Sequence, residues 1–282
     1  MNDETAALLD LDLRDRALTE ESIRTLSPAV RAAANAAETT ILARLGTFPT
    51  TGIDGPNSDI AWLTAFVRTA ERVAEWHASR GVPIDVTAAS LGDVGRHLRL
   101  HRRVQGTFGL ETWWWLTNHF DGALFQLGRL QFLLREVREG EPRQPHGGGW
   151  CLDVHIPDSG PLLPSLVDSS FAQAASFFPH HFPSHFPTGQ CARAVCFSWL
   201  LDPYLAEALP SSSNIVRFQQ QFTRFGTPQE ATADVRYFLF RTRSADPACL
   251  VAETRLQQIF LDRISAGVTW LSCHGSRPLE IG

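Results

Sequence analysis

Apolar residues in the first 120 positions recur at the spacing of α-helices. The segment 56–81 repeats them every three or four positions along one face and ends at Gly81. The segment 27–46 has Pro28 in its first turn and Gly46 just past its end, which are helix start and stop signals. Both segments are therefore predicted to be amphipathic helices.

Three further segments of this half follow the same pattern. Thr19 is placed as the N-cap of a helix in 19–27, and 109–122 is predicted to be helical despite its three consecutive tryptophans. A helix in 90–106 has one apolar face and one basic face, the latter made of Arg96, Arg99, Arg102 and Arg103. We predict an all-α domain over residues 1–120.

After Gly122 the pattern changes to short apolar runs that are typical of strands. Segments 123–137 and 150–157 are predicted to form an antiparallel pair, joined by the Pro- and Gly-rich connection 138–149. The remaining predictions are helices at 164–178, 203–209 and 253–267, a strand at 193–202, and a strand pair from 214–226 and 234–243. Residues 121–282 are thus predicted to form a second domain with a mixed, mostly antiparallel sheet, so the fold class is α+β.

Composition narrows the class of protein. The chain has 282 residues, of which 44% are hydrophobic and 20% charged, and a net charge of -5, which disfavours a general nucleic-acid binder. No apolar run approaches the roughly 20 residues needed to cross a bilayer, and the acidic start lacks the features of a signal peptide. Five cysteines without a CxxC pair fit a reducing compartment. We therefore expect a cytoplasmic protein that does not bind membranes.

A strand, a short loop and a helix follow one another at 150–156, 157–163 and 164–178. Gly160 allows the loop backbone to approach a ligand, and Pro164 suits the first helical position. The unpaired N–H groups and the positive dipole end of such a helix attract anions. This order predicts a phosphate site, although many purely structural loops have the same pattern.

Several sequence motifs resemble a bacterial group of acyltransferases. In order along the chain they are "SLGDVGRHLRLHRR" (90–103), "WWLTNHFDGAL" (114–124), "LGRLQF" (127–132), "VHIPDSGPL" (154–162), "SWLLDPYLAEALP" (198–210) and "SNIVRF" (213–218). The resemblance spans about residues 60 to 280. It implies a helical N-terminal domain followed by a domain with the GNAT N-acyltransferase fold.

The chemistry implied by this resemblance is transfer of an acyl group from a thioester, acyl-CoA in most GNAT enzymes, to an amine of a small molecule. In the GNAT fold the strand before the loop splays from its neighbour and binds the pantetheine arm, while the loop binds the pyrophosphate. Carried over to this chain, the strand is 152–156 and the loop 157–163. The implied donor-binding residues are Val154, Ile156, Ser159, Gly160, Leu162 and Leu163.

The loop departs from the usual GNAT pattern, RxxGxG or RxxGxA. Here "PDSGPLLP" has one glycine, two prolines without N–H donors, and Asp158, whose charge opposes a phosphate. Arg129, Arg217 or the basic face of 90–106 could supply positive charge. Two alternatives therefore stay open: an aminoacyl-tRNA or carrier-protein thioester as acyl donor, or a non-catalytic ligand-binding module.

Four residues are candidate catalytic groups. His155 and Asp153 share one face of the strand, and a histidine is a natural base near neutral pH. We take His155 as the base and Asp153 as its orienting partner, against the alternative of a structural, partly buried histidine. Ser198 is a candidate hydrogen-bond donor, and Tyr204 stands where some GNAT enzymes have their acid. Cys196 is expected to be an inert buried thiol.

Two groups of histidines are close enough in the sequence to be considered as metal ligands. His97 and His101 are four residues apart, but Leu98 stands where an HExxH motif has Glu. The other group, His180, His181 and His185, lies in a Phe/Pro-rich connection without accompanying Cys or Glu. We expect no metal.

Overall fold

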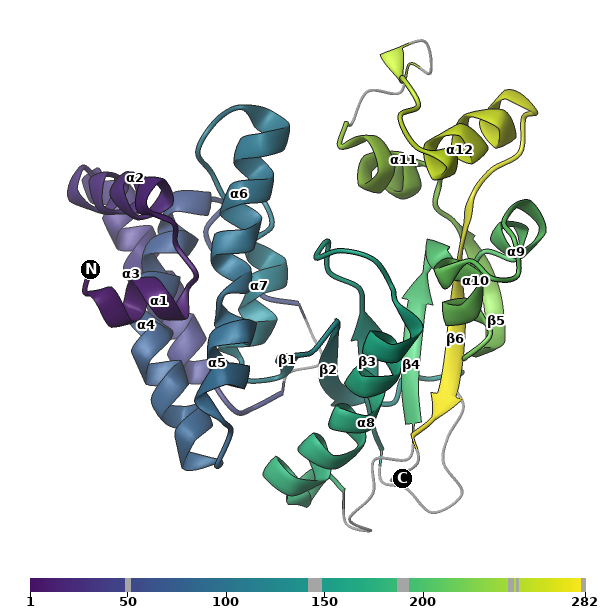
Figure 1. Ribbon diagram of the computed structural model, residues 1–282. Coiled ribbons are helices and arrows are strands. Elements are labelled where there is room, and N and C mark those ends of the chain that lie inside the picture. The colour runs from purple at the N-terminus through teal and green to yellow at the C-terminus, as the bar shows by residue number, and fades with distance from the viewer. Residues whose placement is uncertain (49–51, 142–148, 187–192, 243–245, 247–248, 280–282) are drawn as a thin grey trace.

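The computed structural model describes residues 1–48, 52–141, 149–186, 193–242, 246 and 249–279. Its first part is helical, and its second part is built around a mixed sheet (Figure 1). The helices of the first part are α1 (Asp3–Leu8), α2 (Leu13–Arg24), α3 (Pro28–Arg44), α4 (Asp59–Ser79), α5 (Ile84–Leu91), α6 (Asp93–Gln105) and α7 (Trp113–Phe120).

Side-chain caps explain where several of these helices begin. The Asp12 carboxylate accepts a hydrogen bond from the Asp15 N–H at 2.7 Å, so α2 begins well before Thr19. Thr19 lies inside α2, buried, with its hydroxyl bonded to the Asp15 carbonyl, so its prediction as an N-cap was wrong. Ser27 caps α3 as the Pro28 signal predicted.

The sheet has the strand order β1-β2-β3-β4-β6-β5 across the described residues. Only the β3–β4 pair is parallel; the other neighbours are antiparallel. The bounds are β1 (Leu124–Leu127), β2 (Leu130–Glu136), β3 (Trp150–His155), β4 (Arg193–Ser198), β5 (Thr223–Glu230) and β6 (Leu271–Pro278). The predicted α+β class with a mixed, mostly antiparallel sheet is confirmed.

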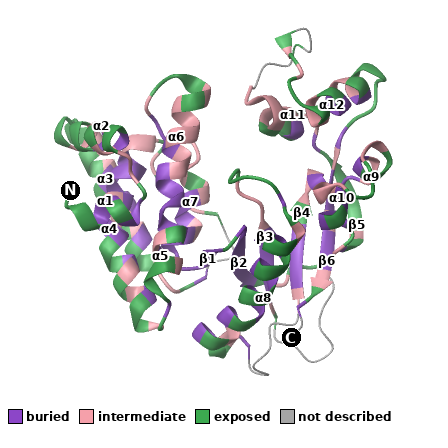
Figure 2. Ribbon diagram, in the orientation of Figure 1, coloured by how far each residue is buried: buried purple, intermediate pink, exposed green. Residues whose placement is uncertain are grey.

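The remaining elements follow the chain around the sheet. They are α8 (Pro164–His181), η1 (Pro183–His185), η2 (Trp199–Leu201), α9 (Tyr204–Ala208), α10 (Asn214–Gln219), α11 (Thr232–Phe240) and α12 (Arg255–Ser265). Helix α8 lies across β1 and β2, where its Phe171 packs edge-on against Phe132 of β2. The strands β2, β3, β4 and β6 are mostly buried (Figure 2).

Two hydrophobic clusters hold the described chain together. One lies among the helices and includes Trp62, Phe66 and Phe120; the other joins the sheet to α8, α11 and α12. The second cluster also takes in Phe48 and Val82 from the helical part. The helical part is therefore packed directly onto the sheet through apolar contacts.

The structure differs from the sequence predictions at three places. Residues 234–243 were predicted as a strand, but Thr232–Phe240 forms α11. Residues 214–226 divide into α10 and the start of β5, whose partner is β6 in the chain's last segment. Segment 123–137 is a hairpin of two strands that turns at Gly128, where φ is 61°. Part of the predicted connection 138–149, residues 142–148, lies outside the described residues. None of the described helices is long and apolar enough to cross a membrane.

Candidate active site

The parallel strands β3 and β4 separate along their length. They pair only at Leu152 with Ala194 and at Asp153 with Val195. Beyond those positions, Val154, His155 and Ile156 have no ladder partner on the β4 side, although β3 stays paired with β2 up to His155. The main chain of β3 is therefore available to an extended ligand at its carboxyl end, as the predicted splayed strand requires.

His155 ends β3 at this opening. Its ring meets Trp115 of α7 edge-on, with centroids 4.5 Å apart. The side chain is 30% exposed, yet its Nε2 atom is buried and makes no hydrogen bond among the described residues. Burial lowers the pKa of His155, outweighing the opposite effect of Asp153. A neutral imidazole with an unused nitrogen is a suitable proton acceptor.

Asp153 is joined to an ion-pair chain on the same face of the sheet. Its Oδ2 lies 3.9 Å from His155 Nε2 and accepts a hydrogen bond from Arg135 Nε at 3.0 Å. Arg135 also pairs with Glu141 at 2.7 Å. These charges are largely buried, so the chain fixes Asp153 beside the histidine rather than leaving it free in solvent.

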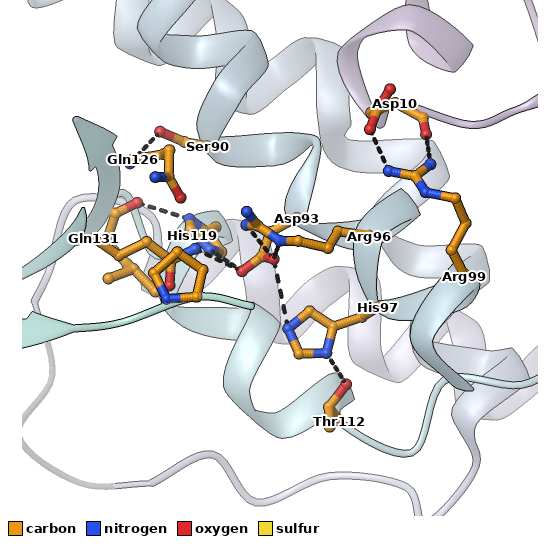
Figure 3. A network of polar contacts seen from close by, with 12 residues as sticks. Asp10, Ser90, Asp93, Arg96, His97, Arg99, Thr112, His119, Gln126 and Gln131 are labelled. Carbon is orange, nitrogen blue, oxygen red and sulfur yellow. Dashed lines mark hydrogen bonds and ion pairs between the residues drawn. The ribbon is translucent and has the colours of Figure 1, made fainter. Parts of the chain in front are cut away.

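A second polar network lies where the helical part meets β1 and β2, and is centred on Asp93 of α6 (Figure 3). Asp93 Oδ2 accepts hydrogen bonds from His119 Nε2 at 2.9 Å and from Gln131 Nε2 at 2.8 Å. Its other oxygen pairs with Arg96 and lies 3.5 Å from His97 Nε2. Burial alone would raise the pKa of Asp93, but the hydrogen bond and charge of His119 hold it well below its usual range.

Gln131 connects this network to the opening between β3 and β4. Gln131 is the cross-strand partner of His155, so the two side chains share one face of β2 and β3. Residues Asp93, His119 and Trp115 were not identified from the sequence. The only available signal was the composition of α6 and α7, in which charged, histidine and tryptophan residues are close together.

The loop after β3 is held by Arg129, which follows the β1–β2 turn. Its guanidinium donates hydrogen bonds to three carbonyl oxygens of the loop: those of Pro157 at 3.0 Å, Gly160 at 2.6 Å and Pro161 at 3.1 Å. Arg129 is only 8% exposed. The N–H groups of Arg129 thus face the loop backbone. The predicted contact of Arg129 with a phosphate of the acyl donor stays a prediction.

While these loop carbonyls accept hydrogen bonds from Arg129, several N–H groups of the same loop have no hydrogen-bond partner within the described chain. The N–H groups of Gly160, Leu162 and Leu163 make no hydrogen bond within the described chain, and Pro164 begins α8 directly after them. Gly160 has φ of 109°, a conformation that side chains rarely adopt. The loop therefore combines free N–H donors with the positive end of a long helix, as an anion site needs.

The other predicted site residues lie near or away from the opening. The Val154 side chain is buried in the core, whereas Ile156, Ser159 and Leu163 are partly or fully exposed on the loop side. Arg217 is exposed on α10, and its side chain makes no hydrogen bond or ion pair within the described chain. Their donor-binding roles stay predictions.

Ser198, the last residue of β4, and Tyr204, the first of α9, have local partners. The Ser198 hydroxyl accepts a hydrogen bond from the Leu200 N–H at 3.1 Å. The Tyr204 ring lies under the Arg263 guanidinium at 4.3 Å and edge-on to Trp270. Cys196 is buried, and burial raises the pKa of its thiol. Among the described residues, no group of three His, Cys, Asp or Glu side chains could hold a metal ion.

Comparisons with known proteins show the family of the chain. Residues 2–122 match the model of the N-acyltransferase N-terminal domain, and residues 124–277 match that of the GNAT-like C-terminal domain. Among curated proteins, none matches the chain in sequence.

Solved acyltransferase structures match nearly the whole chain. One, in complex with decanoyl-CoA and teicoplanin, has 27% identity and a TM-score of 0.85 and covers 98% of this chain and 87% of its own. A second, in complex with CoA and 10C-teicoplanin, has 28% identity, a TM-score of 0.84 and the same coverage. A mutant in complex with octanoyl-CoA has 26% identity and a TM-score of 0.85, again covering 98% and 87%.

The two family models meet where the helical part ends and the sheet begins. The model of the GNAT-like C-terminal domain alone covers more than half of the chain. The resemblance found in the sequence motifs is thereby confirmed. The chain belongs to the GNAT-like N-acyltransferases, with a helical N-terminal region before the acyltransferase domain.

Proposed function

We propose that this enzyme transfers an acyl group from acyl-CoA to an amine, with His155 as the general base. The single observation that carries the proposal is the buried, unbonded Nε2 of His155 at the point where β3 and β4 separate. A proton acceptor beside an unpaired strand is what aminolysis of a strand-bound thioester requires. The similar acyltransferases bound to CoA or acyl-CoA support the donor.

The acyl donor is assigned to the opening and the loop. The pantetheine arm would lie along the unpaired main chain of Val154 and Ile156. The pyrophosphate would lie against the N–H groups of Gly160, Leu162 and Leu163, with Ser159 beside them. Arg129 supports this arrangement by holding the loop carbonyls away from the phosphates.

The chemical step then removes two protons from the acceptor nitrogen and exchanges the thioester C–S bond for an amide C–N bond. The acceptor ammonium gives a proton to His155 Nε2, and the free amine attacks the thioester carbonyl. The tetrahedral intermediate collapses as the C–S bond breaks, which leaves the amide and the CoA thiolate. The second proton lost by the nitrogen neutralises the thiolate, and His155 returns its own proton to solvent.

Asp153, Ser198 and Tyr204 have supporting parts in this proposal. Asp153, held by Arg135, would orient the imidazole and stabilise its protonated form. The Ser198 hydroxyl can relay the second proton of the nitrogen, because it donates its own proton to the leaving sulfur and takes up the proton that the nitrogen loses, while its oxygen accepts from the Leu200 N–H. Tyr204 is proposed as the alternative acid, although its ring is packed against Arg263.

The acceptor is proposed to be an amine of a small molecule. One of the similar acyltransferases is in complex with teicoplanin, so an amine on a glycopeptide is the first acceptor to test. We further propose that the acceptor enters from the face of the sheet that carries His155, since the opposite face is covered by α8. The division at residues 120 and 121 is retained as the domain boundary, supported by the two separate hydrophobic clusters.

Two measurements test the function. Calorimetric titration with CoA and decanoyl-CoA should show micromolar binding, and thiol release should follow addition of amines, teicoplanin among them. Absence of binding at millimolar CoA would refute the proposal and favour a carrier-protein or aminoacyl-tRNA donor. Binding without thiol release against every amine would instead favour a ligand-binding module.

A further inference from the structure

Asp158, on the loop after β3, draws together two arginines from distant parts of the chain. Its Oδ2 pairs with Arg103 Nη2 at 3.1 Å and with Arg241 Nη2 at 2.5 Å. Arg103 belongs to α6 of the helical region, and Arg241 immediately follows α11. The loop stands between these two helices (Figure 1). One carboxylate oxygen thus gathers two cations next to the free loop N–H groups.

These two arginines differ from the other cations near the loop. The Arg129 guanidinium already binds three loop carbonyls. The other basic side chains of the α6 face are paired within the helical region: Arg96 with Asp93, Arg99 with Asp10, and Arg102 with Asp12 and Asp15. Among these cations, Arg103 and Arg241 are therefore the ones that pair with a carboxylate of the loop, that of Asp158.

We propose that the Asp158 carboxylate occupies the place of a ligand anion while the enzyme is free. When the acyl donor binds, Arg103 and Arg241 exchange this carboxylate for a phosphate group of the nucleotide part of the donor. The inference rests on the proposed function and names the source of the positive charge that the loop's own sequence lacks. Guanidinium groups bind phosphate through paired, charge-assisted hydrogen bonds. Asp158 turns toward solvent when the phosphate arrives.

Exposure makes this exchange feasible. Asp158 is 50% exposed and Arg103 66%, so their ion pair is worth little in water and is released at small cost, whereas Arg241 is 21% exposed. Arg241 adopts a left-handed conformation with φ of 54°, which is uncommon for a residue other than glycine. That conformation ends α11 and directs the chain so that the side chain meets Asp158.

The test compares a ligand with phosphates and one without. CoA and pantetheine are titrated into the wild-type enzyme and the variants Asp158→Asn, Arg103→Gln and Arg241→Gln. The controls are Asp3→Asn in α1 and Arg72→Gln in α4, each of which removes one ion pair within the helical region that does not involve the loop. Melting curves on the same samples confirm folding.

Asp158→Asn should bind CoA about two- to fivefold more tightly, because a negative charge near the phosphates is removed. Each arginine variant should bind CoA about three- to tenfold more weakly. Pantetheine affinity should be unchanged throughout, and the controls should match wild type. The gain in Asp158→Asn should shrink at high salt.

Unchanged or weaker CoA binding by Asp158→Asn would overturn the inference, since Asp158 would then only hold the loop. Unchanged CoA binding by both arginine variants would overturn it as well. Wild-type enzyme that binds CoA no better than pantetheine would instead refute the pyrophosphate site in the proposed function. The two failures are therefore distinguishable.

Discussion

His119 of α7 donates its Nε2–H to Asp93 Oδ2 at 2.9 Å while its Nδ1 faces the Leu124 carbonyl oxygen at 2.8 Å. Both ring nitrogens thus lie within hydrogen-bonding distance of an oxygen atom. His119 and Asp93 are each 1% exposed. His119 thus links α6, α7 and β1 through two buried polar contacts at the junction of the helical region with the sheet (Figure 3).

Asp93→Asn should destabilise the fold strongly. The substitution removes the buried carboxylate that pairs with Arg96 and accepts hydrogen bonds from His119 and Gln131, and breaking a buried ion pair costs about 3–5 kcal/mol in the free energy of unfolding. Denaturant unfolding measures the loss. The control Asp85→Asn changes an exposed carboxylate in the first turn of α5 and should cost below about 1 kcal/mol. An Asp93→Asn variant as stable as this control would contradict the buried ion pair.

Local patterns were sufficient for some elements of the fold. The amphipathic helix at 253–267 appears as α12, with Thr254 and Gln257 forming a capping box that its sequence contains. The β3-loop-α8 order was likewise readable, because alternation gives way to helical spacing within one segment.

Other elements depend on tertiary partners that the local pattern does not contain. Residues 232–240 are rich in aromatic residues, which favour strands, yet they form α11, where Val235 is buried and the Tyr237 hydroxyl bonds to Glu111. The polar segment 271–278 forms strand β6 inside the sheet because it pairs with β4 on one side and with β5 on the other.

The candidate site shows the same limit. Alternation along β3 placed Asp153 and His155 on one face, and the structure has Asp153 Oδ2 3.9 Å from His155 Nε2. Trp115 and Asp93 stand at least 35 positions before β3 in the sequence, and no spacing rule connects them to that strand. In the sequence Asp93 reads as an ordinary charged residue of an exposed helix face. Its burial follows only from the docking of α6 and α7 against β1 and β2.

His155→Gln should lower kcat by about 10²–10⁴-fold with little change in CoA affinity. In the wild-type enzyme, burial lowers the pKa of His155. The imidazole is therefore neutral at pH 7, and kcat/KM should fall only as the pH drops below the ordinary histidine value of about 6.5. Single-turnover rates across pH, normalised to folded protein, measure both effects.

The variant should lose this acidic limb of the pH profile. His180→Gln, at the exposed end of α8, is the matched control and should keep both rate and profile. A fully active His155→Gln would remove the histidine from catalysis. Loss of stability of about 1–3 kcal/mol with unchanged turnover would mark it as a structural residue.

His77 should make the fold acid-sensitive. It is fully buried, with its Nδ1 3.1 Å from the Thr87 hydroxyl, and burial together with the charge of His119 lowers its pKa to about 3. The unfolded chain binds this proton near pH 6.5 and the folded chain does not. Stability is therefore fully present above about pH 6.5 and falls by up to about 1.4 kcal/mol per pH unit as the pH drops toward 3.

The His77→Gln variant removes this proton linkage. Its unfolding free energy should depend less on pH between about 6.5 and 4 than that of wild type, even if it is lower throughout. His97 and His155, whose pKa values burial also lowers, contribute with the same sign in both proteins. Denaturant unfolding at several pH values measures the slope, with His180→Gln as control. Equal slopes for wild type and His77→Gln would contradict the prediction.

Arg129→Gln should loosen the loop after β3. The guanidinium spans three carbonyls, and a glutamine amide of shorter reach leaves at least one of them unpaired. We expect a loss of about 1–3 kcal/mol in the free energy of unfolding and a higher KM for acyl-CoA, because carbonyl oxygens are then free to turn toward the phosphates. Arg129→Lys should fail similarly, since an ammonium lacks the planar fork. A truncated donor, acyl-N-acetylcysteamine, has no phosphates, so its KM should stay near the wild-type value. Equal increases in KM for both donors would show that Arg129 acts on the thioester end instead, and unchanged values for both would leave the arginine a purely structural clamp.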